Sequence, residues 1–175
     1  MAMLGKVAMG EGESADQATD LLKQILARGA APAVIHLALG TRALYQGDVD
    51  KGLMHLEQAQ QRNARIPEVL NNLAWGLTQQ DEPDLERARQ LAETAQQLSK
   101  HPETYDTLGT ILAKLGKPRE AVTQLETALR VLPPRAAIHR KLGELYEQLG
   151  DADLAREHRR LAEQMESPVP PGEAK

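Results

Sequence analysis

The side chains best suited to catalysis are few and stand far apart in the sequence. The chain has five histidines and no cysteine. No histidine belongs to a metal-binding pattern such as H-E-x-x-H, and the sequence has neither a glycine-rich phosphate loop nor a nucleophile beside a base. These residues predict no enzyme activity, no cofactor and no metal site. The histidines are His36, His55, His101, His139 and His158.

One short segment carries side chains suited to binding. Trp75 follows Asn71 and Asn72 by about one helical turn. Tryptophan offers a large apolar area and one N–H for a partner, and asparagine can both donate to and accept from a peptide backbone. The segment is therefore a candidate binding surface. The alternative is that Trp75 fills a packing gap between neighbouring helices.

Composition argues against some classes of partner. The net charge is −4 over 175 residues, which argues against a nucleic-acid partner because the phosphate backbone needs a basic surface. No apolar run is long enough to span a bilayer, so direct membrane insertion is not expected. Residues 1–10 lack the apolar core of a signal peptide. The cytoplasm is the default compartment; the periplasm or envelope applies if a leader or longer N-terminal region was removed.

A repeat must position these side chains. Leu39-Gly40, Leu73-Ala74, Leu108-Gly109 and Leu142-Gly143 recur at steps of 34, 35 and 34 residues. Turn signals follow three of these pairs, at Gly47-Asp48, Gly116-Lys117 and Gly150-Asp151. Self-similarity at this period is the signature of stacked repeats. His36 and His139 take equivalent places in this repeat, where we expect them to be packing residues.

Each repeat reads as two helices joined by a short turn. In the third unit, Tyr105, Leu108, Ile111 and Leu115 fall at steps of three or four residues, as on one face of a helix. A break at residues 116–118 separates this run from a second one, which extends to Leu132 and ends at Pro133-Pro134. The sequence therefore predicts an all-α protein.

These positions together resemble tetratricopeptide repeat (TPR) proteins. The third unit matches the family pattern at Tyr105, Leu108, Gly109, Leu112, Ala121, Leu125, Ala128 and Pro133. Gly52 in an alanine position and Arg159 in a bulky apolar position depart from it. The resemblance implies a right-handed superhelical solenoid of antiparallel helix pairs, with repeats at residues 33–66, 67–101 (with a longer turn), 102–135 and 136–166.

The two ends of this array differ. Leu4-Gly5 stands 35 residues before Leu39-Gly40, so we interpret residues 1–32 as a divergent or clipped N-terminal unit. Arg156, Arg159 and Glu163 replace apolar residues that face the next unit elsewhere, which predicts a solvated capping helix at the C-terminal end. Residues 167–175 contain three prolines and no apolar period, and we expect a disordered tail.

The family resemblance implies where a partner binds. TPR arrays bind extended peptides or helices in a concave groove that the first helices of the pairs line. On this chain the groove positions are Leu37, Thr41, Tyr45, Asn71, Asn72, Trp75, Gln79, Asp106, Thr110, Lys114, Arg140 and Glu144, with Lys141 beside them. Asparagine stands at the Asn72 position in only one unit, and the family's clamp for a C-terminal carboxylate is not reproduced.

Two functions remain open on the sequence. The first is a non-enzymatic adaptor or scaffold in a bacterial assembly that binds a partner's peptide or helix in the groove. The second is a scaffold that associates with its own copies, as a homo-oligomer in an envelope or exopolysaccharide-export system. A weaker resemblance of the segment around Asn71–Trp75 to terminal TPR arrays of bacterial exopolysaccharide and protein-sorting envelope proteins favours the bacterial setting.

Overall fold

The computed structural model describes residues 12–29, 32–131 and 135–166, and every regular element in these ranges is an α-helix. The chain divides into two compact units, Met1–Lys100 and His101–Lys175. The helices of the first unit are α2 (Glu13–Ala27), α3 (Ala33–Tyr45), α4 (Val49–Arg62), α5 (Pro67–Leu77) and α6 (Leu85–Leu98). Those of the second unit are α7 (Pro102–Lys114), α8 (Pro118–Val131), α9 (Ala136–Gln148) and α10 (Ala152–Glu166).

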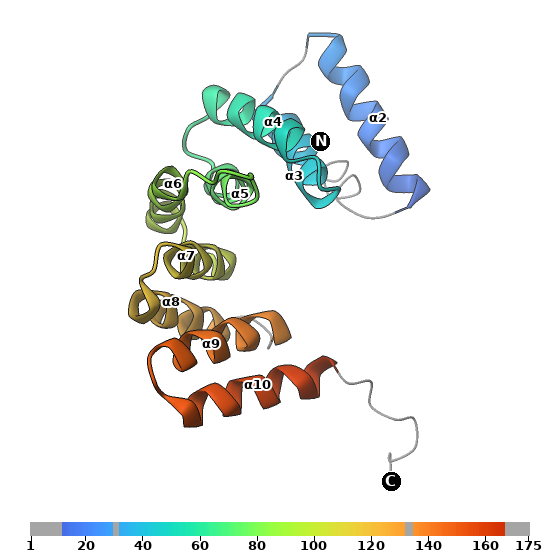
Figure 1. Ribbon diagram of the computed structural model, residues 1–175. Coiled ribbons are helices and arrows are strands. Elements are labelled where there is room, and N and C mark those ends of the chain that lie inside the picture. Colours follow the sequence, from blue (N-terminus) through green and yellow to red (C-terminus); the bar gives the residue numbers. More distant parts are fainter. Residues whose placement is uncertain (1–11, 30–31, 132–134, 167–175) are drawn as a thin grey trace, which may run out of the picture. The chain divides into compact units, whose positions relative to one another are not determined.

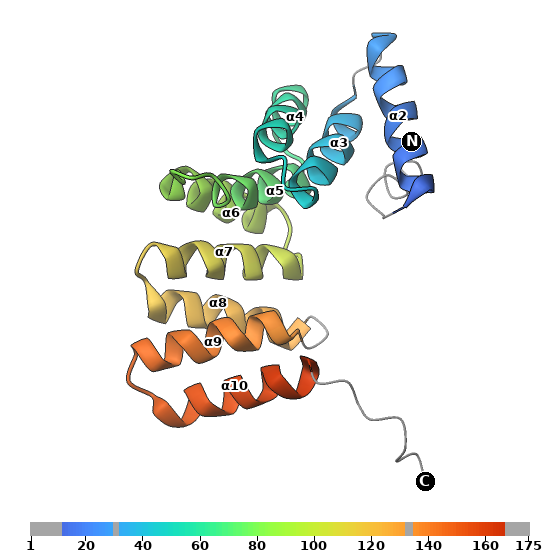
Figure 2. The same cartoon turned by 45° about the vertical axis from the view of Figure 1, so that its right-hand side comes forward.

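Antiparallel helix pairs build both units, as the sequence predicts. The most extensive contacts between helices join α3 to α4 and α5 to α6 in the first unit, and α7 to α8 and α9 to α10 in the second. Figure 1 shows the short turns within these pairs, and Figure 2 shows α7 to α10 lying one upon the next. The all-α class is therefore confirmed.

The turns inside three of the pairs share one geometry. Gly47, Gly116 and Gly150 each adopt a positive φ, between 70° and 82°. The next residue's N–H then donates to a carbonyl five residues earlier, as in Asp48 N to Ala43 O at 2.9 Å. Asp48 also caps α4 by accepting from the backbone N–H of Lys51. The left-handed conformation explains why glycine recurs at this place.

A size relation between facing side chains sets the packing within each pair. A Cβ at Gly40 or Gly109 would lie 2.7 Å from the Cγ of Leu56 or Leu125, respectively, so each glycine leaves room for a leucine. The second pair has Ala74 at the glycine position, and the residue at the leucine position is Ala92. Both alanines are fully buried. Where the first helix carries alanine in place of glycine, its partner thus carries alanine in place of the larger leucine.

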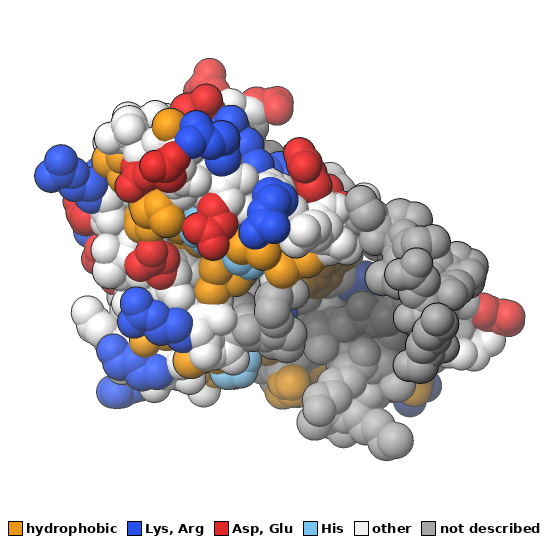
Figure 3. Space-filling view, turned by 90° about the horizontal axis from the view of Figure 1, so that it is seen from below, with side chains coloured by type: hydrophobic (Ala, Val, Ile, Leu, Met, Phe, Trp, Pro, Cys, Tyr) orange, Lys and Arg blue, Asp and Glu red, His pale blue; other side chains and the backbone are white. Residues whose placement is uncertain are grey.

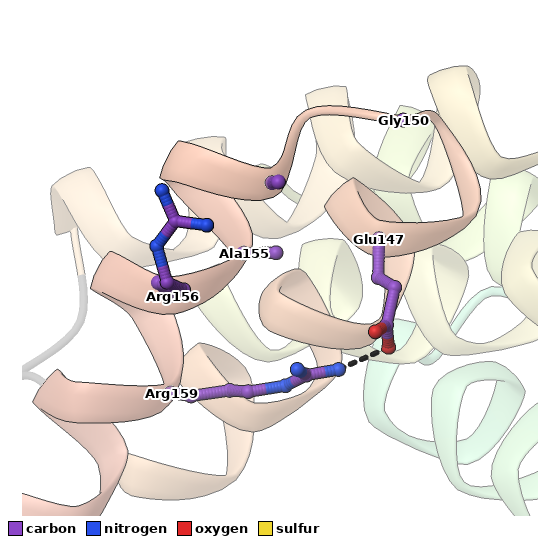
Figure 4. A pocket seen from close by; sticks show the side chains of 6 residues that line it. Glu147, Gly150, Ala155, Arg156 and Arg159 are labelled. Atoms are coloured by element: carbon purple, nitrogen blue, oxygen red, sulfur yellow. Dashed lines mark hydrogen bonds and ion pairs between the residues drawn. The ribbon is translucent and has the colours of Figure 1, made fainter.

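Arg159 of α10 stands at the position of Leu56 and Leu125, and its surroundings refine the expected cap. The sequence predicts that this position faces the following repeat, but Leu125 packs over Gly109 of its own pair. A Cβ at Gly143 would lie 3.0 Å from the Cγ of Arg159, so the arginine stem covers the glycine. The guanidinium reaches past it to pair with Glu147 (Figure 4).

The outer face of α10 carries charges of both signs. Arg156 and Glu163 are exposed, as is Arg159 beyond the stem that covers Gly143. Arg156 pairs with Asp153 on the same helix. Figure 3, which views the α10 end of the molecule, shows basic and acidic side chains interspersed with hydrophobic ones.

Arg159→Ala is expected to change the free energy of unfolding by only about 0.5 kcal/mol, because the ion pair with Glu147 is exposed. Leu125→Arg, by contrast, places a charge at a fully buried position and is expected to unfold the pair α7/α8. Chemical denaturation followed by circular dichroism measures both changes. Equal losses at the two positions would show that the Arg159 stem holds the pair α9/α10 together as strongly as Leu125 holds α7/α8.

The N-terminal helix α2 packs on α3 through a small apolar cluster. Ala18 and Leu22 meet Ile35, Ala38 and Leu39, and Ile25 and Leu26 lie at the margin. Arg42 of α3 pairs with Asp16 of α2. Leu21 of α2 is 46% exposed. Leu4-Gly5, Pro133-Pro134 and the expected disordered tail lie outside the described residues.

Candidate functional site

The predicted groove residues are distributed over both compact units, and each unit's set is described by itself. The first-unit patch lies on α3, α5 and the turn after α5, and comprises Leu37, Thr41, Tyr45, Asn71, Asn72, Trp75 and Gln79. The second-unit patch lies on α7 and α9, and comprises Asp106, Thr110, Lys114, Lys141 and Glu144. Arg140, also predicted, is on α9 but pairs with Glu166 at the end of α10.

An aromatic pair dominates the first-unit patch. Tyr45 is the last residue of α3, and its ring lies against that of Trp75 on α5, with the ring centroids 5.7 Å apart and the planes at 41°. Such a tilted arrangement is favourable for aromatic rings. Tyr45 is 74% exposed and Trp75 is half-buried. Trp75 therefore packs against a ring of a neighbouring helix and stays partly exposed, and its role in binding a partner remains a prediction.

Asn72 is engaged inside the protein. Its Nδ2 donates to Thr41 Oγ1 at 2.8 Å, which ties α5 to α3, and Thr41 itself is buried. The amide of Asn71 lies 3.5 Å from Asn72 Oδ1, and Asn71 Oδ1 is buried without a hydrogen-bond partner among the described residues. Sequence reasoning treated Asn72 as a reader of a partner's backbone. The structure shows it holding two first helices together.

A charged network organises the second-unit patch. Lys141 Nζ of α9 pairs with Asp106 Oδ1 of α7 at 2.8 Å and donates to Thr110 Oγ1 at 2.6 Å. Thr110 in turn donates to the carbonyl oxygen of Asp106 at 2.8 Å. Asp106 is therefore engaged with the next first helix. Beside this network lies a pocket of about 200 Å³ lined by Thr110, Ala113, Lys114, Lys141, Glu144, Leu145 and Gln148.

Gln79 lies apart from the aromatic pair, beyond the end of α5. It is exposed, and its Nε2 donates to Thr78 Oγ1 at 2.7 Å. It borders an open hollow between the α3–α4 and α5–α6 turns, whose other walls include Asp48, Asp50, Asp81 and Glu82. The predicted groove residues of the first unit thus extend from an aromatic pair to the rim of an acidic hollow at these turns.

His36 and His139 are buried between the helices of their pairs, which confirms the prediction that they are packing residues. Sequence reasoning missed their partners. His55 faces His36 and His158 faces His139, each 19 residues further along the chain. The recurrence of the same spacing at the same repeat positions was the available signal. Among the described residues, no group of three or more potential ligands is arranged to hold a metal ion.

Comparison with known proteins agrees with the repeat. The tetratricopeptide repeat family model matches residues 37–102 and 107–166. Among solved structures, MamA of MSR-1 is 24% identical with a TM-score of 0.67, and the alignment covers 86% of each chain. PilF of Pseudomonas aeruginosa is 22% identical with a TM-score of 0.74, covering 88% of this chain and 70% of that one.

A thermophilic TPR protein of Thermus thermophilus is 22% identical with a TM-score of 0.68, covering 86% of this chain and 82% of that one. Such likenesses show a shared fold. A search of curated proteins finds no match. Within the described ranges, no helix has the length and apolar character to cross a membrane.

Proposed function

Because the chain belongs to the tetratricopeptide repeat family, we propose that it is a non-enzymatic interaction module whose first helices bind a peptide or helix of a protein partner. The family's members are in general protein-interaction scaffolds, which supports the broad assignment. The observation that carries the finer one is the exposed Tyr45–Trp75 pair, because it places a large apolar surface on two adjacent first helices.

The two patches suit different parts of a partner. The Tyr45–Trp75 surface accommodates an apolar anchor, since aromatic side chains bury much area at low entropic cost. The second-unit pocket has Ala113 and Leu145 in its walls and charges of both signs, Lys114 and Glu144, beside them. It fits an aliphatic side chain flanked by polar or charged groups. A partner of mixed charge with at least one apolar anchor follows from this chemistry.

The setting we propose is a scaffold in a bacterial assembly, in the cytoplasm by default and in the periplasm or envelope if the native chain carries a leader. Solved TPR structures of similar fold come from Pseudomonas aeruginosa and Thermus thermophilus, which is compatible with this setting. The second candidate is self-association. Leu21 favours it, because this leucine stays 46% exposed on α2, the terminal described helix of the first unit.

A differential capture experiment tests the proposed function. The immobilised chain, its Trp75→Ala variant and a Met54→Ala control are exposed to extract from the native source. Met54 is a 50% exposed apolar residue on the second helix α4 and lies outside the first-unit patch, so it matches Trp75 in chemistry only. We expect a partner that binds the wild type and the control and is lost with Trp75→Ala.

The mass of the chain in solution distinguishes groove binding from self-association. A monomer at micromolar concentration supports the adaptor. The opposite outcome is an oligomer that grows with concentration, is dissociated by Leu21→Glu and is unaffected by Trp75→Ala. That outcome would show self-association through α2 in place of groove binding.

A further inference from the structure

Two histidine pairs occupy the same positions in the first and last complete helix pairs. His36 Nδ1 lies 3.1 Å from His55 Nδ1 across α3 and α4, and the rings are 5.3 Å apart at 44°. His139 Nδ1 lies 2.9 Å from His158 Nδ1 across α9 and α10, with the rings 5.1 Å apart at 33°. Each pair therefore joins a first helix to its second helix by one contact between ring nitrogens.

Such a contact depends on the protonation of both rings. A hydrogen bond between two Nδ1 atoms needs a proton on one and a lone pair on the other, so the two rings take complementary tautomers. One added proton still leaves one Nδ1 able to accept. When both rings are imidazolium ions, both Nδ1 atoms carry protons, and two positive charges face each other across about 3 Å. The hydrogen bond then becomes a repulsive contact.

Burial opposes protonation of all four rings. It is the largest cause that lowers the pKa of His36, His55, His139 and His158 below the ordinary histidine value. Because the folded state favours the neutral rings, their contribution to stability is complete at pH values above 6.5, the histidine pKa in the unfolded chain. This contribution is lost as the pH falls from 6.5 through the lower pKa values of the folded state.

The charges around the two pairs have opposite signs. Lys23 of α2 and Lys51 of α4 act on His55, and Arg62 of α4 acts on His36, so cations oppose protonation of the first pair. Glu126 of α8 and Glu157 of α10 act on His158 and favour its protonation.

Tyr146 of α9 stacks on His158 at 5.5 Å and donates its hydroxyl hydrogen to Glu126 Oε1. Burial and this carboxylate raise the pKa of Tyr146 to about 12, so the tyrosine stays neutral where histidine titrates. His158 of the second pair thus faces an acidic environment, and both rings of the first pair face a basic one.

We propose that the two histidine pairs are acid-sensitive clasps that release α3 from α4 and α9 from α10 as the pH falls, the α9–α10 clasp opening at the higher pH. The intervening helix pairs lack the device. The equivalent positions hold Tyr105 and Gln124 in α7/α8, and Leu70 and Leu91 in α5/α6. Acid therefore loosens one helix pair in each compact unit and leaves the others closed.

The loosened helices include the partner-facing ones. Tyr45 lies on α3, and Lys141 and Glu144 lie on α9. If the proposed binding function holds, and this consequence rests on it, opening of the clasps displaces both patches and weakens partner binding in an acidic compartment. The opening itself is a property of the chain alone and is tested without any partner.

The test follows the full chain from pH 8 to pH 4. Histidine Cε1–H signals in NMR spectra report the titration of each ring, and amide hydrogen exchange, corrected for the intrinsic effect of pH, reports opening of each helix. We expect His158, which faces Glu126 and Glu157, to titrate at a higher pH than His55, which faces Lys23 and Lys51. As each histidine pair becomes protonated, amide protection should fall first in α9 and α10 and then in α3 and α4. Helices α5 to α8 should keep their protection.

Variants built from the chain's own repeat positions supply the controls. His36→Tyr with His55→Gln, and His139→Tyr with His158→Gln, copy the Tyr105 and Gln124 residues of α7/α8 and should abolish the acid-dependent loss in the altered pair. Tyr105→His with Gln124→His should confer such a loss on α7/α8. If a variant with a substituted histidine pair does not fold at neutral pH, the exchange profile of the wild-type chain is the test of the proposal. Uniform loss of protection over all helices, or rings that titrate with no change in exchange, would overturn the proposal.

Discussion

Gly109→Ala is expected to destabilise the second unit by about 1–3 kcal/mol, and Leu125→Ala in the same helix pair by about 2–5 kcal/mol. Glycine in the middle of a helix is normally about 0.5–1 kcal/mol worse than alanine. Here the added Cβ would lie 2.7 Å from Leu125 Cγ and 3.3 Å from the carbonyl oxygen of Ala121, and overpacking outweighs the gain in helix propensity. Leu125→Ala leaves a cavity, because the leucine is fully buried.

The double variant tests whether these two losses have one cause. Gly109→Ala with Leu125→Ala recreates the Ala74 and Ala92 pair of α5/α6. Because the new methyl group enters space that the leucine vacates, the double variant should lose less stability than the sum of the single changes, by roughly 0.5–3 kcal/mol. Urea denaturation followed by circular dichroism measures all three free energies of unfolding.

Thr123→Ala is the matched control for this cycle. Thr123 lies on the exposed face of α8, and its replacement should change stability by no more than about 0.5 kcal/mol. Strict additivity of Gly109→Ala and Leu125→Ala would show that the glycine is not there to admit the leucine. A stabilising Gly109→Ala would show the same.

Trp75→Ala is expected to weaken partner binding by about 2 kcal/mol, which is roughly a thirtyfold rise in Kd. The loss arises because the exposed Tyr45 ring alone no longer forms a continuous apolar surface with α5. Helical content should be unchanged, since Trp75 is only half-buried and its neighbours Leu73 and Ala74 hold the core. Titration calorimetry with the captured partner's binding segment gives the Kd, and circular dichroism gives the helical content.

Two further variants sharpen this prediction. Tyr45→Ala removes the more exposed ring and should also weaken binding, whereas Met54→Ala should leave the Kd within experimental error. Asn72→Ala acts differently, because it removes the hydrogen bond to Thr41 and should lower stability by about 1 kcal/mol. Normal binding by Trp75→Ala, together with loss of association in Leu21→Glu, would show that the contact lies on α2.

The sequence by itself determined the helix pairs and much of their interior. The recurrence of Leu-Gly at about 34 residues placed Leu108 and Leu142 in the core, and the turn glycines predicted where α3, α7 and α9 end. Local rules suffice for these features, because the helical period decides which side chains share a face and a left-handed turn residue favours glycine. The same rules put Tyr45 and Trp75 on first helices.

The tertiary structure decided which polar side chains are already engaged. Asn72 and Lys141 look available in the sequence, yet they bind Thr41 and Asp106 on the preceding first helix. His55 and His158 find their partners in the same way, across a helix pair. Repeat position tells which way a side chain points, but a hydrogen bond needs two groups within about 3 Å with suitable orientation. That depends on how closely two helices distant in sequence approach, and the packed residues between them set this distance.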